Sequence, residues 1–301
     1  MKHTVVIGTR GSKLALWQAN WVADELRRHN QGLEVELRHI ITTGDRILDV
    51  PLAKIGGKGL FTKELEVAML AGEIDVAVHS LKDMPTELPP GLVIGAVTRR
   101  EHPGDALICP AFGTLGQLPL GARVGTSSLR RRAQLLQTRP DLNISDLRGN
   151  LDTRLKKLDD GQLDAIVLAV AGLVRLGWED RITEILSADV CLPAVGQGAL
   201  AIECRGEDTR MLSLLQGLED RATRQAVTAE RAFLHAVEGG CQVPVGVFAQ
   251  LKGTLLELEA AILTTNGTRM IRDKLASQPT DADRMGRELA DRMLAAGGRA
   301  V

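Results

Sequence analysis

The sequence is poor in aromatic residues: it contains no tyrosine, and phenylalanine and tryptophan together make up 2% of its 301 residues. Side chains that stack on nucleic-acid bases are therefore scarce, and a net charge of −1 lacks the basic excess that binds phosphate backbones. The longest apolar run, residues 165–174, is far shorter than the ~20 residues that span a bilayer. Residues 1–8 lack the apolar core and cleavage site of a signal peptide. We therefore expect a cytoplasmic protein that binds neither nucleic acid nor membranes.

Cysteine is also rare, and no C-x-x-C pair occurs among the four residues of this type, which are Cys109, Cys191, Cys204 and Cys241. This spacing argues against a zinc site or a redox motif, so we predict no bound metal. Cys241 follows Gly239 and Gly240, whose freedom to adopt positive φ favours an exposed loop. Such a thiol is a candidate nucleophile, although most lone cysteines are buried and inert. His235, six residues earlier, leaves a cysteine hydrolase open as an alternative.

Strand-like and helix-like segments alternate through residue 215, which predicts an α/β fold with mainly parallel sheets covered by helices. Residues 5–7, 33–37, 75–80 and 92–97 have the patterns of strands. Two helices are expected from apolar residues at helical spacing, namely Leu14, Trp17, Trp21 and Leu26 in one and Phe61, Leu65, Ala68 and Met69 in the other.

A faint internal repeat predicts two lobes of similar architecture. Residues 7–12 resemble residues 124–128, and residues 72–76 resemble residues 161–165, in the same order. We place the first lobe at residues 1–99 with a return segment at 196–216, and the second lobe at 104–195. A third, C-terminal domain is expected at 220–301. It opens with a helix to Val237 and continues with strands at 245–251 and 255–263 and a helix after Asp281, which favours a small antiparallel α+β domain.

Arginine is the commoner basic residue, and several arginines fall where strands pass into helices or where helices end: Arg10, Arg130, Arg131, Arg148, Arg154 and Arg175. Helix N-termini, which attract anions, are expected at Ser12 and at Thr126–Ser128. Simple helix caps and a solvated basic helix face are the alternatives. In an open α/β sheet these edges line the ligand crevice, so the pattern favours a ligand with several carboxylates or phosphates between the lobes. Asp83, after a buried strand, is a candidate carboxylate for a cationic intermediate or a surface partner of Lys82.

Seven segments of the chain resemble the porphobilinogen deaminase family in order, and together they cover nearly the whole chain. They are residues 8–15 (GTRGSKLA), 57–64 (GKGLFTKE), 78–85 (VHSLKDMP), 125–131 (GTSSLRR), 147–150 (LRGN), 193–198 (PAVGQG) and 239–241 (GGC). The C-terminal 50 residues match only loosely. The resemblance implies two lobes like those of periplasmic binding proteins and a small third domain that carries the cysteine loop.

The resemblance also implies a reaction. Four porphobilinogen molecules are joined head to tail with loss of ammonia, and the linear tetrapyrrole hydroxymethylbilane is released. A dipyrromethane primer, built from substrate and bound covalently to Cys241 through a thioether, stays on the enzyme. Asp83 matches the catalytic carboxylate, which would stabilise a positively charged azafulvene and assist proton transfer.

The remaining residue roles follow from the same resemblance. Primer binding is implied for Ser80, Lys82, Asp83, Thr126, Ser127, Ser128, Arg130, Arg131 and Arg154, with the role of Ser127 the least defined. Contact with the substrate or the growing chain is implied for Arg10, Ser12, Gln18, Arg148 and Arg175. Lys54, Lys58 and Phe61 would belong to a mobile lid. We expect a monomer, and a non-catalytic anion-binding protein of the same fold is the main alternative to the enzyme.

Overall fold

A computed structural model describes residues 4–46, 59–237 and 244–298, which divide into two compact units. The first unit contains the described residues up to Glu101 together with Ala199–Arg224, and the second contains His102–Gly198 and the described residues from Gln225 onward. The predicted lid residues Lys54 and Lys58 and the predicted primer attachment site Cys241 lie outside the described residues.

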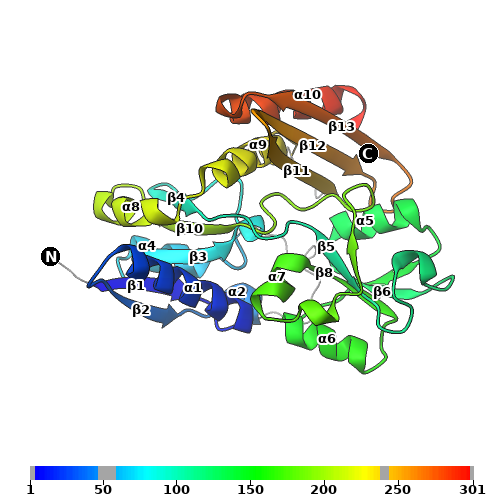
Figure 1. Cartoon of the computed structure of the whole chain (residues 1–301), viewed down its shortest axis with the longest axis horizontal. Helices are drawn as coiled ribbons and strands as arrows, with labels where there is room; N and C mark the ends of the chain where they lie inside the picture. The colour runs from blue at the N-terminus through cyan, green and yellow to red at the C-terminus, as the bar shows by residue number, and fades with distance from the viewer. Residues whose placement is uncertain (1–3, 47–58, 238–243, 299–301) are drawn as a thin grey trace. The chain divides into compact units, whose positions relative to one another are not determined.

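The first unit is built on a five-stranded sheet in the order β2 (Glu34–His39), β1 (Thr4–Thr9), β3 (Val76–Ser80), β10 (Leu200–Arg205), β4 (Leu92–Val97). Only β10 runs against the other four strands. One face packs on α1 (Lys13–His29) and α8 (Thr209–Leu215), and the other on α4 (Lys63–Leu70). The short α2 (Thr43–Arg46) and 3-10 helices at Leu81–Asp83 and Gln216–Leu218 complete the unit (Figure 1).

The second unit repeats this topology in the order β7 (Asn143–Ser145), β6 (Arg123–Gly125), β8 (Ala165–Ala169), β5 (Asp105–Ile108), β9 (Glu184–Leu186). Again one strand, β5, runs against the other four. The α-helices within residues 102–198 are α5 (Leu129–Thr138), α6 (Leu151–Asp159) and α7 (Val170–Arg175), and 3-10 helices span Leu115–Gln117 and Glu179–Arg181.

Equivalent side chains confirm that the two sheets are related. The Asp75 carboxylate accepts a hydrogen bond from the Val6 amide at 2.9 Å, and the Asp164 carboxylate accepts one from the Arg123 amide at 2.7 Å. Asp75 immediately precedes β3 and bonds to the neighbouring strand β1, and Asp164 immediately precedes β8 and bonds to the neighbouring strand β6. The repeat found in the sequence therefore corresponds to a repeated structural unit.

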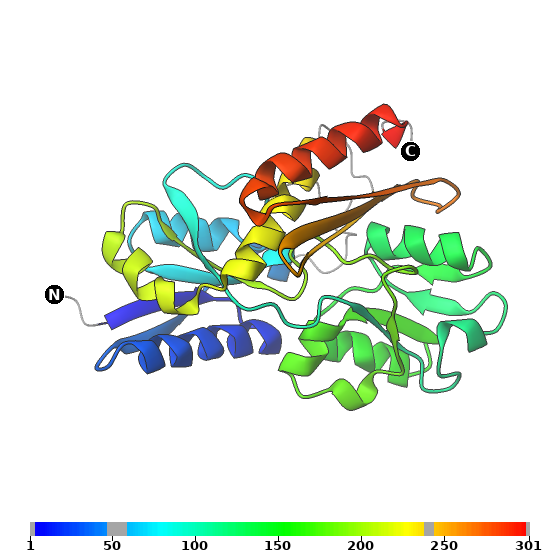
Figure 2. The same ribbon diagram turned by 45° about the horizontal axis from the view of Figure 1, so that its top comes forward.

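The C-terminal part is an antiparallel sheet of β11 (Val245–Lys252), β12 (Leu255–Leu263) and β13 (Met270–Ser277). Helices α9 (Arg221–Val237) and α10 (Ala282–Ala295) cover one face around the buried Phe233, and a 3-10 helix at Pro279–Asp281 precedes α10 (Figure 2). The other face packs against Ala133 of α5 and Leu192. The predicted fold class is thus confirmed, while β13 was not predicted.

The prediction of which residues of α1 are buried was only partly correct. Leu26 of α1 is buried, but Leu14, Trp17 and Trp21 are only partly buried, and the helix instead buries Gln18, Ala19, Val22 and Ala23. Small alanines allow the helix to lie close to the sheet, so the large tryptophans stay at the margin of the core. The predicted domain boundaries remain a prediction, although β10 within the expected return segment pairs with β3 and β4.

Candidate active site

Asp83 lies where the central strand of the first sheet ends. β3 is buried up to His79, and a 3-10 helix of three residues follows it directly, with Lys82 and Asp83 exposed. Buried Leu81 anchors this turn, and its amide donates to the Ala199 carbonyl at 3.0 Å. The turn therefore holds a solvent-facing carboxylate at the carboxyl end of a rigid strand, a location where open α/β sheets bind ligands.

Gln18 and Ser80 are brought together beside this turn. The Gln18 Nε2 atom donates to Ser80 Oγ at 2.9 Å, and Gln18 is buried within α1 although its side chain is polar. Ser12 caps the start of α1 by accepting a hydrogen bond from the Ala15 amide at 3.3 Å. Two residues predicted to contact substrate thus also fix the helix and the strand end of the first unit.

Arg10 and Phe61 form a second group in the first unit. The guanidinium of Arg10 lies 4.2 Å from the centroid of the Phe61 ring, which is cation–π geometry. It also forms an ion pair with both carboxylate oxygens of Asp45. Burial alone would raise the pKa of the Asp45 carboxyl, but hydrogen bonds from Arg10 and Thr42 lower it below its ordinary value. Asp45 therefore holds Arg10 in place as a charged partner.

This stack predicts a substitution effect at Gly44. A Cβ atom on Gly44 would lie 2.1 Å from Cε1 of Phe61, so Gly44→Ala must displace the ring from Arg10. Losing a cation–π contact of about 0.5–1 kcal/mol should raise the KM for the substrate that the resemblance implies a few-fold and leave the chain folded. Gly116→Ala is the matched control because a Cβ there meets nothing within 4 Å. Steady-state kinetics of both variants would check this, and an unchanged KM in Gly44→Ala would remove Phe61 from the site.

In the second unit, three consecutive hydroxyl residues form the loop between β6 and α5. Thr126 Oγ1 accepts from the Ser128 amide at 3.2 Å, and Ser128 Oγ caps α5 by accepting from the Arg131 amide at 3.4 Å. Ser127 Oγ donates to the Leu147 carbonyl at 3.0 Å and accepts from its amide at 2.9 Å. Ser127 thereby ties this loop to the segment that carries Arg148, which gives a structural role to the residue whose role the sequence left least defined.

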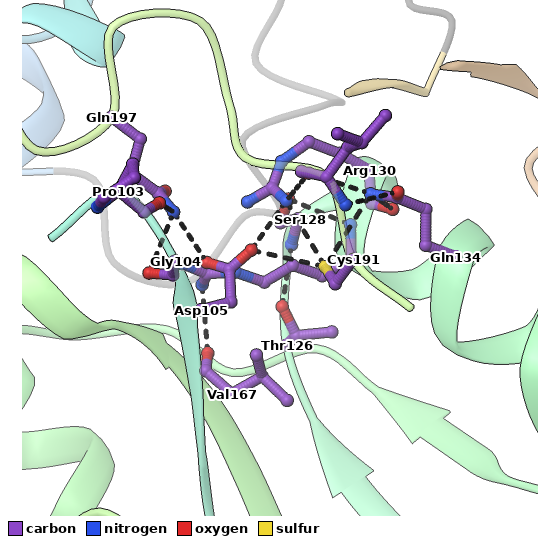
Figure 3. Close-up of polar contacts among 12 residues, drawn as sticks. Pro103, Gly104, Asp105, Thr126, Ser128, Arg130, Gln134, Val167, Cys191 and Gln197 are labelled. Atoms are coloured by element: carbon purple, nitrogen blue, oxygen red, sulfur yellow. Dashed lines mark hydrogen bonds and ion pairs between the residues drawn. The ribbon is translucent and has the colours of Figure 1, made fainter. Parts of the chain in front are cut away.

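Arg130 and Arg131 converge on Asp105, the first residue of β5. Figure 3 shows Arg130 and Asp105 with their other partners. Arg130 Nη1 lies 2.6 Å from Asp105 Oδ2, and Arg131 Nη2 lies 2.7 Å from Oδ1. All three residues are buried, and Asp105 has no exposed surface. Although burial opposes charge on each group, the two guanidiniums hold the pKa of Asp105 far below its usual range, and Asp105 raises the pKa of Arg130. Asp105 and Arg130 are therefore both charged.

The other predicted arginines of the second unit lie at helix ends, as the sequence indicated. Arg154, in the first turns of α6, donates from Nε to the Gly149 carbonyl at 2.8 Å, where Gly149 has a φ of 109°. Arg148 immediately precedes that glycine. Arg175 is the last residue of α7 and donates from Nη2 to the Gly198 carbonyl at 2.6 Å. The two hydrogen bonds help to fix the positions of Arg154 and Arg175.

The three described cysteines are poor nucleophiles. Cys109, Cys191 and Cys204 are at most 1% exposed. Burial raises the pKa of the Cys109 thiol, and it raises the pKa of Cys191 to about 12 and that of Cys204 to about 11. Because thiolate is the reactive form, these three residues are chemically inert near neutral pH.

Sequence reasoning missed Asp45, Asp105 and Gln197. Gln197 Nε2 donates to Asp105 Oδ1 at 2.9 Å and to the Pro103 carbonyl at 2.7 Å. Asp105 is the first residue of a buried apolar strand, and a charged residue in that position requires a partner. This was the available signal, but it does not identify which arginines supply the partner.

Comparison with known proteins decides the family. Residues 5–213 match the family model "Porphobilinogen deaminase, dipyromethane cofactor binding domain", and residues 224–295 match "Porphobilinogen deaminase, C-terminal domain". The chain belongs to the porphobilinogen deaminase family. Proteins named porphobilinogen deaminase from Desulforamulus reducens, Pelotomaculum thermopropionicum and Geobacter sulfurreducens are 54%, 53% and 52% identical to it. They cover 100%, 99% and 98% of this chain, which in turn covers 97%, 95% and 92% of theirs.

Solved structures with related topology include the periplasmic VFT2 domain of Bordetella pertussis BvgS, at 18% identity and a TM-score of 0.42, covering 72% of this chain and 86% of that one. Staphylococcus aureus protein PG110 covers 95% of this chain and 100% of its own at 11% identity and a TM-score of 0.46. The fold class of this porphobilinogen deaminase family member rests on its own sheets.

Among residues 4–46, 59–237 and 244–298, no helix combines the length and apolarity needed to cross a membrane. The same ranges contain no cluster of three or more His, Cys, Asp or Glu side chains arranged to hold a metal ion.

Proposed function

We propose that this chain is a porphobilinogen deaminase, also called hydroxymethylbilane synthase, which condenses four porphobilinogen molecules head to tail and releases ammonia at each condensation. The observation that carries this conclusion is the match to the family over nearly the whole chain, at 52–54% identity to relatives with that name. The arrangement of Asp83 and the arginines supports the same activity. Its product is the linear tetrapyrrole hydroxymethylbilane.

The side chains of the second unit fit a dipyrromethane cofactor. Each pyrrole ring carries an acetate and a propionate, so the ligand needs cationic and hydroxyl donors. Arg130 donates to described residues through Nη1 alone, and its Nε and Nη2 are left for a carboxylate. We assign the cofactor's carboxylates to two sets of residues, namely Thr126, Ser127, Ser128, Arg130, Arg131 and Arg154 of the second unit and Ser80 and Lys82 of the first unit. We assign its covalent attachment to Cys241 through a thioether. When bound, the cofactor supplies the pyrrole carbon to which the first substrate is joined.

Asp83 is proposed as the catalytic carboxylate. Loss of ammonia from porphobilinogen leaves a cation, and an exposed carboxylate on a rigid strand end can stabilise that charge and accept or return the pyrrole proton. The rigid attachment matters because the carboxylate needs no reorganisation when charge develops. Arg10, Ser12, Gln18, Arg148 and Arg175 are assigned to the carboxylates of incoming substrate and of the growing chain.

We assign Lys54, Lys58 and Phe61 to a lid over the site, of which only Phe61 lies among the described residues. We further propose that the protein is a cytoplasmic monomer that binds no nucleic acid, in keeping with its net charge of −1 and few aromatic residues.

The proposed function is tested by the products of a reaction that contains only the purified protein and porphobilinogen. We expect one ammonia per porphobilinogen consumed and a linear tetrapyrrole as the product. Dialysis against a chelator should leave the rate unchanged, because no metal is assigned a role. Measured ammonia and tetrapyrrole, before and after chelation, would check both points. Consumption of porphobilinogen without ammonia, or a rate restored only by added metal, would contradict the proposal.

A further inference from the structure

The buried cluster around Asp105 has more positive than negative charge. Arg130 and Arg131 are adjacent in α5, and side chains one position apart on a helix diverge by about 100°. Both nevertheless reach the same carboxylate, Arg131 through Nε at 2.9 Å and Nη2 at 2.7 Å. Cys191 Sγ lies 3.2 Å from Asp105 Oδ2, and its raised pKa of about 12 keeps the thiol neutral. Two guanidiniums thus face one carboxylate, which leaves one positive charge for an anionic ligand.

The two guanidiniums differ in how fully the protein uses them. Arg131 donates through all three nitrogen atoms, to Asp105 and, through Nη1, to the Val167 carbonyl at 2.9 Å. Arg130 uses Nη1 alone among the described residues, for Asp105, Cys191 Sγ and the Leu192 carbonyl at 2.6 Å. Asp105 and the Val167 carbonyl together hold Arg131 by all three nitrogen atoms. Asp105 holds Arg130 by one edge only, so that the other edge keeps a defined direction (Figure 3).

A chain of hydrogen bonds links this cluster to the elements on either side of Cys241 in the sequence. Gln197 contacts Asp105, and the amide of the preceding residue, Gly196, donates to Glu230 Oε2 at 2.6 Å. Glu230 of α9 accepts a second bond at Oε1, from the Ala249 amide of β11 at 2.9 Å. α9 ends at Val237 and β11 begins at Val245, so the helix before Cys241 and the strand after it are both tied, through residues in their interiors, to the segment that contacts Asp105.

We propose that Asp105 is a positioning residue for cofactor acquisition, which orients Arg130 toward a carboxylate of the ligand that Cys241 will bind. Asp105 itself touches no ligand and acts through Arg130 and Arg131. The inference rests on the proposed function, because that function supplies the anionic ligand. It adds a residue that neither the sequence nor the family resemblance assigned.

The test compares Asp105→Asn with Asp75→Asn, a matched loss of a buried carboxylate that is paired with Arg205 in the first unit. Apoprotein of each variant is incubated with porphobilinogen, and intact mass gives the fraction of chains carrying the adduct over time. A charge-assisted hydrogen bond is worth about 1.5–3 kcal/mol, so loading of Asp105→Asn should be slower by about tenfold or more. Asp75→Asn should acquire the adduct at a rate within about twofold of the wild type, even if its Tm falls as much as that of Asp105→Asn.

Equal loading of the two variants would overturn the proposal. If Asp105→Asn does not fold, Asp105→Glu decides instead, because it keeps the charge but moves it by one methylene. We expect slow loading of a folded Asp105→Glu chain, and wild-type loading of that variant would overturn the positioning role.

A second measurement separates this inference from the proposed function. Porphobilinogen binding is measured by calorimetry on chains that also carry C241S. If the wild type carries no adduct, the proposed cofactor chemistry is wrong. The role of Asp105 is then decided by the porphobilinogen affinities of the C241S chains alone. Weaker binding with Asp105→Asn than with Asp75→Asn would support positioning, and equal binding would overturn it.

Discussion

Replacing Asp83 by asparagine should lower kcat by about 10²–10³, the usual loss when a group that stabilises developing charge is removed. Asparagine has the same shape but no negative charge, and it cannot accept a proton. Porphobilinogen binding should change little, because positive charge develops on the pyrrole ring only as ammonia leaves. Steady-state kinetics should therefore show a large fall in kcat with a small change in KM.

The control for Asp83→Asn is Asp24→Asn, which removes another exposed carboxylate of the first unit, from the surface of α1. Its kcat should equal that of the wild type. A cysteine hydrolase, the alternative suggested by His235 and Cys241, would not depend on Asp83. Near wild-type turnover in Asp83→Asn would show that this residue is only a surface partner of its neighbours.

Cys241→Ser should have an even larger effect and reduce turnover to background. A serine hydroxyl is far less nucleophilic than a thiolate, so the variant should fail to acquire the cofactor while remaining folded. Cys109→Ala is the matched control: its thiol is buried with a raised pKa, and its loss should lower stability but not loading. Turnover and circular dichroism of both variants would check this, and an active, unloaded Cys241→Ser chain would refute the covalent assignment.

Local signals in the sequence predicted the elements that hold the site. Ser12 and Ser128 were expected at helix starts, and each caps a helix in the structure. Two equivalent turns, one at Gly72 with a φ of 74° and one at Gly161 with a φ of 72°, precede the equivalent strands β3 and β8. Such features depend on residues close together in the chain, so the residue types themselves carry the information.

Features set by distant contacts could not be predicted in this way. β13 carries Arg272, Asp273 and Lys274 in succession, so its sequence lacks the alternation of apolar and polar residues that is typical of a strand. This strand forms because it pairs with β12. Asp105 and Arg130 lie 25 residues apart, and nothing in either local sequence indicates their pairing. The assignment of Arg130 and Arg131 to a ligand therefore missed that the protein itself uses one nitrogen atom of Arg130 and all three of Arg131.

The intact mass of the purified, active wild-type protein tests the central claim most directly. The account predicts a mass above the 32.4 kDa of the polypeptide by one two-ring pyrrole adduct, which peptide mapping would place on Cys241. The Cys241→Ser chain should show the mass of its polypeptide alone. A fully active preparation at 32.4 kDa, with the Cys241 thiol free, would contradict the account.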